Sequence, residues 1–288
     1  MPKYQRWKGI MKCYPFEEER LAKWKPPYIV HIKYDGFRSK SIPIQTGLKL
    51  NEYLLLSSEG NVQYSVPHID RAFSSLHLDG EFDGELYSHR LYLEGGFDLI
   101  SSIVSRTVNL HPRHEEIEFH CFDIINDLPQ MKRLLIIENL KDLHPKIKVA
   151  PFWICETLDE IKKVYDEIIE KGYEGIVVRH FSNFYEEKRS TYVMKFKPKK
   201  QDTYEIVGWN EEISIEGEPK GRIGSLIMSS QTGDTFAVGA GLDSNEKDLL
   251  WKIRDQISDH KAIVHYQHLT NKKIPKGCFD IEIPDLNI

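Results

Sequence analysis

The stretch HIKYDGFRSK, at positions 31–40, gathers a lysine, a carboxylate, a glycine and an arginine between Lys33 and Arg38. A lysine amine can attack a phosphoryl group, but only after it loses its proton, and its ordinary pKa of about 10.4 keeps nearly every molecule charged at pH 7. Nearby cations favour the neutral amine, and Arg38 with a bound metal would provide them. The plain alternative is an edge strand that enters a turn. Whether Lys33 is a nucleophile therefore depends on whether the rest of the chain supplies the partners that such a lysine needs.

Two glutamates farther along the chain are candidate metal ligands. Glu85 lies in FDGELY (82–87) and Glu174 in YEGIVVR (173–179). Magnesium prefers oxygen ligands from one or two carboxylates, together with phosphates and water. The segment LDGEFDGEL contains Asp-Gly-Glu twice. We select the copy that ends at Glu85, and the copy that ends at Glu81 stays an alternative.

A basic run, KFKPKK at 195–200, would complete such a site. Lys195 and Lys197 alternate with Phe196, so on a strand both lysines would share one face. There they could grip phosphates and add to the positive charge around Lys33. A solvated run of charge is the alternative interpretation.

Five motifs in this order make the chain resemble the covalent nucleotidyltransferases, which comprise ATP-dependent DNA ligases, RNA ligases and mRNA capping enzymes. The resemblance covers nearly the whole chain and is closest to the minimal DNA ligases of viruses and phages. The motifs are KYDGFR (33–38), FDGELY (82–87), FHCFDI (119–124), YEGIVVR (173–179) and YVMKFKPK (192–199).

The resemblance implies an enzyme, a DNA ligase that uses ATP and Mg²⁺, with Mn²⁺ as an alternative metal. Lys33 would attack the α-phosphate of ATP, release pyrophosphate and carry AMP to the 5′-phosphate of a nick in duplex DNA. The 3′-hydroxyl would then displace AMP and seal the strand, as in DNA replication, repair or recombination. The alternatives are an RNA ligase, a capping guanylyltransferase, or a nucleic-acid binding module with a degenerate site.

The resemblance also assigns roles to individual residues. Lys33 is the catalytic residue, Phe122 would stack on adenine, and Glu174 would organise the metal together with Glu85. Asp35 is expected to have a structural, hydrogen-bonding role. The full ATP- and AMP-binding set is His31, Ile32, Lys33, Arg38, Glu85, Phe122, Arg189, Lys195 and Lys197.

Two positions depart from the family pattern. Many relatives bond the adenine amino group through the residue two before the lysine, which here is His31; its neutral imidazole could accept that bond. The motif that normally reads Ser-Arg-x-Gly here reads Ser57-Ser58-Glu59-Gly60, so an arginine expected near the nick is absent.

The pattern of elements predicts an α+β protein with two domains. Short β-branched runs and an amphipathic helix over 157–172 predict antiparallel sheets and helices in residues 1–200, and the resemblance makes this region an adenylation (nucleotidyltransferase) domain, ATP-grasp-like in fold. Residues 201–288 contain five short strand patterns with a helical stripe, 245–257, between the third and fourth. That order is typical of an OB-fold β-barrel.

Composition limits the class of protein. The chain has 288 residues, 40% of them hydrophobic, and a net charge of −5, so any DNA contact must come from local basic surfaces. The four dispersed cysteines predict reduced thiols rather than a metal or disulfide framework. We expect a cytoplasmic monomer with no membrane partner, encoded by a cell or by a virus or phage that acts in its host.

Overall fold

The chain forms two compact units, the N-terminal unit Met1–Lys197 and the C-terminal unit Pro198–Ile288, each described by itself. The computed structural model describes residues 9–46, 49–198, 200–230, 232–258, 260–266, 268–270, 273–278 and 280–286. The division lies close to the boundary near residue 200 that the change in pattern predicts.

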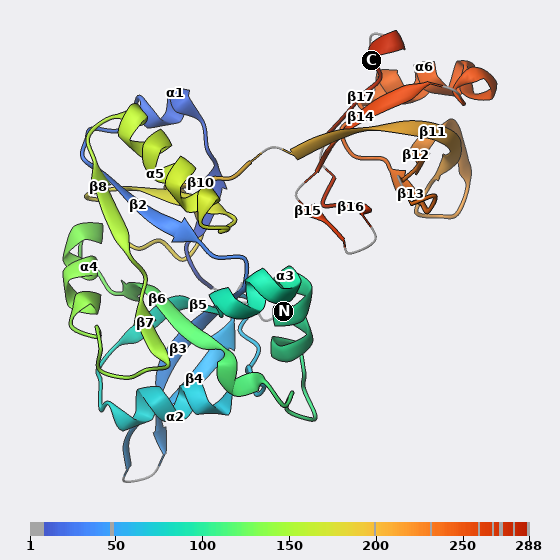
Figure 1. Cartoon of the computed structure of the whole chain (residues 1–288). Helices are drawn as coiled ribbons and strands as arrows, with labels where there is room; N and C mark the ends of the chain where they lie inside the picture. The colour runs from blue at the N-terminus through green and yellow to red at the C-terminus, as the bar shows by residue number, and fades with distance from the viewer. Residues whose placement is uncertain are drawn as a thin grey trace, which may run out of the picture. The chain divides into compact units, whose positions relative to one another are not determined.

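One sheet of the N-terminal unit carries the predicted lysine. Its order is β1-β10-β9-β2-β8, with β1 parallel to β10 and the other pairs antiparallel. The helix α5 (Leu158–Glu170) packs against β9 and β8, and the short α1 (Glu18–Leu21) follows β1 (Figure 1). The strands are β1 (Lys12–Pro15), β2 (Tyr28–Lys33), β8 (Phe152–Cys155), β9 (Gly175–His180) and β10 (Arg189–Phe196).

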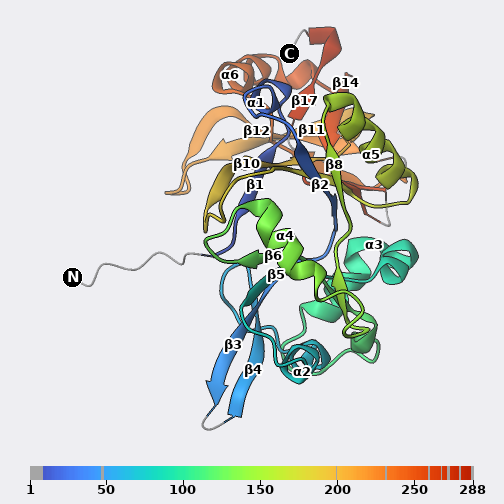
Figure 2. The same cartoon turned by 90° about the vertical axis from the view of Figure 1, so that its left-hand side faces the viewer.

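The second sheet, in the order β4-β3-β5-β6-β7, shares one hydrophobic core with the first. Helix α2 packs on β4, as Figure 2 shows, and α4 packs on β6. The strands are β3 (Phe37–Thr46), β4 (Lys49–Ser57), β5 (Glu81–Tyr87), β6 (Glu118–Ile125) and β7 (Ile147–Val149). The helices are α2 (Pro67–Ser75), α3 (His89–Val104), η1 (His114–Glu116) and α4 (Gln130–Glu138).

Helix α5 confirms the helix predicted over 157–172, with one change at its start. Thr157 is the N-cap, and its hydroxyl accepts a hydrogen bond from the backbone of Glu160 at 3.2 Å. In a capping box, which the spacing of Thr157 and Glu160 allows, the Glu160 carboxylate would accept from the backbone N–H of Thr157. It instead accepts from the backbone N–H of Glu156, at 2.7 Å. Both bonds satisfy donors at the helix start, so the cap works with its second bond moved one residue upstream.

The C-terminal unit is a five-stranded antiparallel sheet, β13-β12-β11-β14-β17, with α6 (Ser244–Lys252) between the third and fourth strands in chain order. The five strands are β11 (Lys200–Ile213), β12 (Pro219–Ser229), β13 (Thr235–Val238), β14 (Lys261–Tyr266) and β17 (Asp280–Glu282). A short turn η2 (Arg254–Gln256) follows α6, η3 (Pro284–Leu286) follows β17, and β15 (His268–Leu269) pairs with β16 (Pro275–Lys276).

The predicted closed barrel is not found in the part of the chain that the structure describes. The strand number and the place of the helix are as predicted, but β13 and β17 are the two edges of the sheet, and no described pairing joins them. The architecture is thus a mixed α/β protein with several sheets.

Two smaller expectations can be compared with the structure. Cys13, Cys121, Cys155 and Cys278 are all free thiols, as their dispersal predicts, with Cys121 and Cys155 buried. Among the described residues, no helix combines the length and the apolar character that crossing a membrane requires.

Candidate active site

The KYDGFR motif is the connection between the two sheets of the N-terminal unit. Lys33 is the last residue of β2 in the first sheet, and Arg38 is the second residue of β3 in the second. Gly36 allows this crossing, because a Cβ there would come within 3.0 Å of Glu85 Cγ and closer still to the carbonyl oxygen of Leu86. The spacing of the motif therefore places its lysine and its arginine on facing elements.

Lys33, Glu174 and Lys197 meet where β2, β9 and β10 come together. The Lys33 amine donates to Glu174 Oε2, and the Lys197 amine lies 3.3 Å from Glu174 Oε1. The three side chains are 22%, 17% and 19% exposed, so solvent and a ligand can still reach the group. The structure thus brings together three residues that were predicted from motifs about 140 and 20 residues apart in the sequence.

The charge around Lys33 differs from the prediction. Burial by itself lowers the pKa of Lys33, but the carboxylate of Glu174 outweighs it, with help from Glu85 and Asp35, and the net pKa is raised above its ordinary value. We expected cations as the dominant neighbours. The amine is instead held protonated by carboxylates, and the neighbouring Lys197, whose pKa burial lowers, is the group closer to neutrality.

Glycine at position 175 makes this arrangement possible. Gly175 pairs with Lys33 across β2 and β9 and has φ of +154°. A Cβ there would lie 3.0 Å from Lys197 Cα and would collide with the carbonyl oxygen of Phe196. Without a side chain, β10 can pass close enough for Lys197 to reach Glu174.

Arg38 is fixed by a fully buried carboxylate that sequence reasoning passed over. Its Nε and Nη2 each donate to Asp83 at 2.6 Å, and the second oxygen of Asp83 also accepts from the Tyr185 hydroxyl at 2.6 Å. Asp83 is 0% exposed, and its charge is the main influence that raises the pKa of Arg38 against the effect of burial. The bidentate pair orients the guanidinium as well as holding its charge.

Glu85, rather than Glu81, lies beside this group. It is directly opposite Arg38 in the β3–β5 ladder, and its charge reaches Lys33, whereas Glu81 forms an ion pair with Lys40 at 2.8 Å. Burial raises the pKa of Glu85 to about 8, although Arg38 and Lys33 both act to lower it. A carboxyl group kept neutral in this way gains most from an added cation, which fits a metal ligand.

The structure bears differently on the structural role expected of Asp35 and on the predicted metal ligands. Asp35 bonds the hydroxyl of Tyr92, in agreement with the structural role expected of it. In the described residues, three side chains with ligand atoms within 4.8 Å of one another occur in the C-terminal unit, at His265, Asp280 and Glu282, and not around Glu85 and Glu174. The two predicted glutamates would therefore hold a metal together with ligand and water oxygens.

Phe122 belongs to the core in this structure. It is 6% exposed, and the guanidinium carbons of Arg38 and Arg179 lie 4.4 and 5.4 Å from its ring centroid. Arg179 is itself held by Asp123 at 3.1 Å. Stacking on adenine stays a prediction, and a base would have to share the ring with these cations.

His31 and Ile32 point to opposite faces of β2, as neighbours on a strand must. Ile32 is 6% exposed and packs in the core, so only its backbone could serve a nucleotide. His31 is 1% exposed, and neither of its ring nitrogens has a hydrogen-bond partner within the described chain. Burial lowers the pKa of His31 well below its usual range, and Arg179 adds to that effect, so the ring is neutral.

Arg189 is not brought to the site. It is the first residue of β10, at the end opposite Lys195, and it donates to the backbone oxygen of Cys13 and lies over the Tyr14 ring at 5.5 Å. Lys195 is near the other end of β10 and its charge reaches Lys197. Arg189 and Lys195 therefore lie toward opposite ends of β10, although the resemblance placed both in the nucleotide-binding set.

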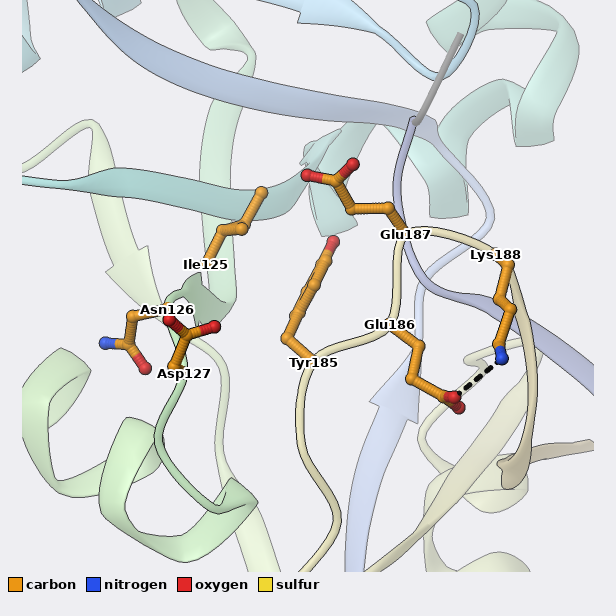
Figure 3. A pocket seen from close by; sticks show the side chains of 7 residues that line it. All are labelled: Ile125, Asn126, Asp127, Tyr185, Glu186, Glu187 and Lys188. Atoms are coloured by element: carbon orange, nitrogen blue, oxygen red, sulfur yellow. Dashed lines mark ion pairs between the residues drawn. The ribbon is translucent and has the colours of Figure 1, made fainter. Parts of the chain in front are cut away.

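Tyr185 is the functional candidate with the weakest sequence signal. Its hydroxyl bonds both Asp83 and, at 3.1 Å, the backbone N–H of Met11. Its other side lines a surface hollow of about 770 Å³ (Figure 3), in which Glu186 and Lys188 form a 3.0 Å ion pair. Tyr185 lies in the segment FSNFYEEKR, which has neither helical nor strand periodicity. Its role could therefore be recognised only from its contact with Asp83 in the folded chain.

Comparison with known proteins agrees with the motifs. Residues 11–197 match the family described as the ATP dependent DNA ligase domain. The DNA ligase of Thermococcus onnurineus is 25% identical over 257 residues, which cover 81% of this chain and 43% of that protein. The DNA ligase of Archaeoglobus fulgidus is 35% identical over 69 residues, or 22% of this chain and 12% of that protein. The chain spans less than half the length of these curated relatives.

Solved structures share the fold. A structure from work on Lig E DNA ligases, described as DNA binding with a minimal scaffold, has a TM-score of 0.70 at 19% identity and covers 96% of this chain and 98% of that one. The Chlorella virus DNA ligase-adenylate has a TM-score of 0.51 at 20% identity, covering 95% and 98%. At such identities the likeness concerns the fold alone.

Proposed function

This chain belongs to the family of ATP-dependent DNA ligase domains, and from that premise we propose that it seals nicks in duplex DNA through an adenylated lysine. The observation that carries the proposal is the convergence of Lys33, Glu174 and Lys197 at the ends of three strands. A lysine with a carboxylate and a second cation has the parts needed to attack a phosphate and to stabilise the charge that develops on it.

In the first step the Lys33 amine attacks the α-phosphorus of ATP, and the bond to pyrophosphate breaks. Glu174 holds this amine in place but also holds its proton, since it raises the Lys33 pKa. Attack therefore requires that the negative charge beside the amine be compensated. Lys197, on the other oxygen of Glu174, and Lys195 provide positive charge where the phosphates would lie.

Glu174 and Glu85 are the residues that would hold a divalent metal, Mg²⁺ or Mn²⁺. The raised pKa of Glu85 and the partial exposure of Glu174 suit oxygen ligands whose charge is completed by a cation. A metal bound there would take the place of the Glu85 proton, offset the charge of Glu174 and withdraw charge from the phosphates.

In the later steps AMP passes from Lys33 to the 5′-phosphate of the nick, and the 3′-hydroxyl then attacks that phosphate and releases AMP. Arg38 is suited to a phosphate or ribose of the nick, because Asp83 binds its Nε and Nη2 and so fixes the plane in which the remaining Nη1 donors point.

We further propose that the C-terminal unit is an OB-type domain that engages DNA. Its strand number and helix position support this, and so does the close approach of the segment after β13 to β17. A Cβ on Gly241 would lie 2.6 Å from Asp280 Cα. The two edges of the sheet thus come near one another without a described ladder between them, which suits a partly open barrel.

The test is covalent labelling. The full chain, mixed with ATP radiolabelled at the α-phosphate and Mg²⁺, should give an acid-stable lysine-linked adduct, and Lys33→Ala should abolish it. Glu174→Ala should slow sealing by at least about a hundredfold, because the loss of charge stabilisation at a phosphate costs several kcal/mol. A labelled Lys33→Ala protein would overturn the proposal.

The alternatives are separated by the second substrate. Adding nicked duplex DNA to the labelled protein should discharge AMP and yield sealed DNA. Discharge onto nicked RNA alone would favour an RNA ligase, and labelling by GTP followed by transfer to a 5′-diphosphate RNA end would favour a capping enzyme. The family match favours DNA.

A further inference from the structure

Two buried polar side chains near Lys33 have nitrogen atoms that no described group of the protein satisfies. They are His31, with Nδ1 and Nε2, and Arg179, with Nε. Their exposures are 1% and 3%, so bulk water does not serve them. Buried donors and acceptors are nearly always bonded in folded proteins, and a cluster of exceptions beside a reactive group indicates a ligand.

The two side chains share a face of the first sheet. In the β2–β9 ladder Ile29 is opposite Arg179 and Val177 is opposite His31, so His31 and Arg179 are diagonal neighbours on one face. Lys33 is on this face too, two residues along β2 from His31, at a rise of about 7 Å. That separation is comparable to the ribose between a nucleotide's α-phosphate and its base. A nucleotide with its α-phosphate at Lys33 therefore brings its base to His31.

The remaining bonds of Arg179 fix its orientation. Its Nη1 donates to Asp123 at 3.1 Å and to Gln130 at 3.3 Å, which leaves Nε as an oriented donor. His31 is different, because a neutral imidazole carries one donor and one acceptor nitrogen and can exchange them between tautomers. The pair therefore consists of one fixed donor and one group that adapts.

We propose that His31 and Arg179 read the N7 and C6 edge of a purine, and that this pair accepts a 6-oxo purine as well as adenine. The inference rests on the function proposed above and deepens it by naming the class of nucleotide. Adenine presents an acceptor at N7 and a donor at its 6-amino group, whereas guanine and hypoxanthine present acceptors at both positions. Arg179 suits N7 in either case, and His31 accepts from the amino group in one tautomer and donates to the oxygen in the other.

The transfer is the same for both nucleotides. The bond between Lys33 Nζ and the α-phosphorus forms, the bond from that phosphorus to the bridging oxygen breaks, pyrophosphate leaves, and the amine proton passes to solvent. A fixed acceptor in place of His31 would face the lone pairs of a 6-oxo group. Sites with a fixed hydrogen-bond pattern reject a mismatched substrate by about 10⁴-fold or more.

The experiment compares ATP with ITP, each radiolabelled at the α-phosphate, as substrates for labelling the full chain with Mg²⁺. ITP has the guanine edge without the 2-amino group, so the comparison isolates the 6-position. We expect the initial labelling rate with ITP to be within about tenfold of that with ATP, a difference of at most about 1.4 kcal/mol. A preference for ATP of about a thousandfold or more would overturn the inference.

Two matched variants sharpen the test. His31→Glu in its ionised form, which the charge of Arg179 favours, supplies an acceptor that cannot donate, so the ATP preference should rise at least thirtyfold over the wild type. His31→Gln, whose amide can turn either way, should leave that preference near the wild-type value. An unchanged ratio in a folded His31→Glu protein would contradict the role of His31. Calorimetric binding of AMP and IMP to the wild-type chain should give affinities within about tenfold, and it reads base recognition without the transfer step.

The outcomes keep the two proposals apart. If ATP gives no adduct, the proposed function fails. If ATP labels Lys33 and ITP neither labels nor binds, the function stands and only the inference about the base fails.

Discussion

Two carboxylates in the N-terminal unit each lie between two cations, and the difference between them separates scaffold from chemistry. Asp123 accepts from Arg133 at 2.7 Å and Arg179 at 3.1 Å, and these three side chains are 0 to 3% exposed. Glu174 lies between Lys33 and Lys197, and all three are about a fifth exposed. The carboxylate of the first cluster is fully buried, whereas that of the second is partly exposed.

The choice of cation follows the same division. An arginine does not lose its proton in a protein, and its planar fork can satisfy a buried carboxylate at two points, which makes it suitable for a permanent link. Asp123 uses this to tie β6 to α4 and β9. A lysine can become neutral when its surroundings change, which a nucleophile must do. In these two clusters, arginines therefore pair with the buried carboxylate and lysines with the more exposed one.

The largest expected effect tests whether Lys33 must be able to lose its proton. Lys33→Arg keeps the charge beside Glu174 but replaces the amine with a group that stays protonated, so adduct formation from labelled ATP should fall by at least about a thousandfold. Lys197→Arg is the control and should keep activity within about tenfold, because only positive charge is asked of it. Equal losses in the two variants would contradict the distinction.

The next effect is on stability. Arg133→Met should lower the free energy of unfolding of the N-terminal unit by about 3–5 kcal/mol in urea titrations, because it leaves a buried carboxylate short of a partner. Arg113→Met also removes ion pairs, with Glu94 and Glu116, but in a more exposed place. There the loss should be much smaller, because exposed ion pairs are screened by solvent. Similar losses would show that burial does not distinguish the two.

A smaller effect concerns pH. The pKa of Glu85 is raised to about 8, so between its unfolded value near about 4.3 and that value the folded chain binds a proton that the unfolded chain releases. The contribution of Glu85 to stability should therefore fall as pH rises from about 4.5 to about 8, opposite in sign to that of His31, and Glu85→Gln should remove about 1–3 kcal/mol of that fall. Asp70, with a pKa raised to about 7, acts in the same window, so Asp70→Asn serves as the comparison.

That pH prediction is checked by urea midpoints of the wild type and both variants at several pH values from 5 to 9. A Glu85→Gln protein whose pH dependence of stability equals that of the wild type would contradict the assignment of a neutral Glu85.

The smallest effect is expected from a cation outside both clusters. Arg189 is exposed and contacts only the β1 segment in the described contacts, so Arg189→Ala should change the rate of nick sealing by less than about threefold. A loss of a hundredfold would show that Arg189 contacts the substrate, as its place in the predicted ATP- and AMP-binding set implies.

The sequence could predict what depends on local pattern. Helix α5 was predicted to within two residues at its end, since a 3.6-residue stripe is a property of the segment itself, and β-branched runs likewise indicate β6 and β9. Strand β1 was not predicted. Its four residues, KCYP, include a charge and a proline, and the strand exists because β10, more than 170 residues away, pairs with it.

The candidate site shows the same limit. The motifs identified Lys33, Glu174 and Lys197. They did not show that carboxylates dominate around the Lys33 amine, because side-chain rotamers and burial decide which charged neighbour lies closest to it. The link from Tyr185 through Asp83 to Arg38 was missed for the same reason. Arg189 was assigned to the nucleotide-binding set by family resemblance, and the sequence alone could not show at which end of β10 it lies.

The packing around Gly175 has a consequence for how this sequence can vary. In a saturation library selected for survival by ligation, codons other than those for glycine should disappear at position 175, because even a methyl group would collide with the backbone of β10. Gly217 and Gly233 also have positive φ, yet nothing lies within 4 Å of a Cβ at either. Those positions should drift to asparagine or aspartate, which tolerate that backbone. Substitution should thus be tolerated at these two turns of the C-terminal unit and not at Gly175, beside the nucleophile.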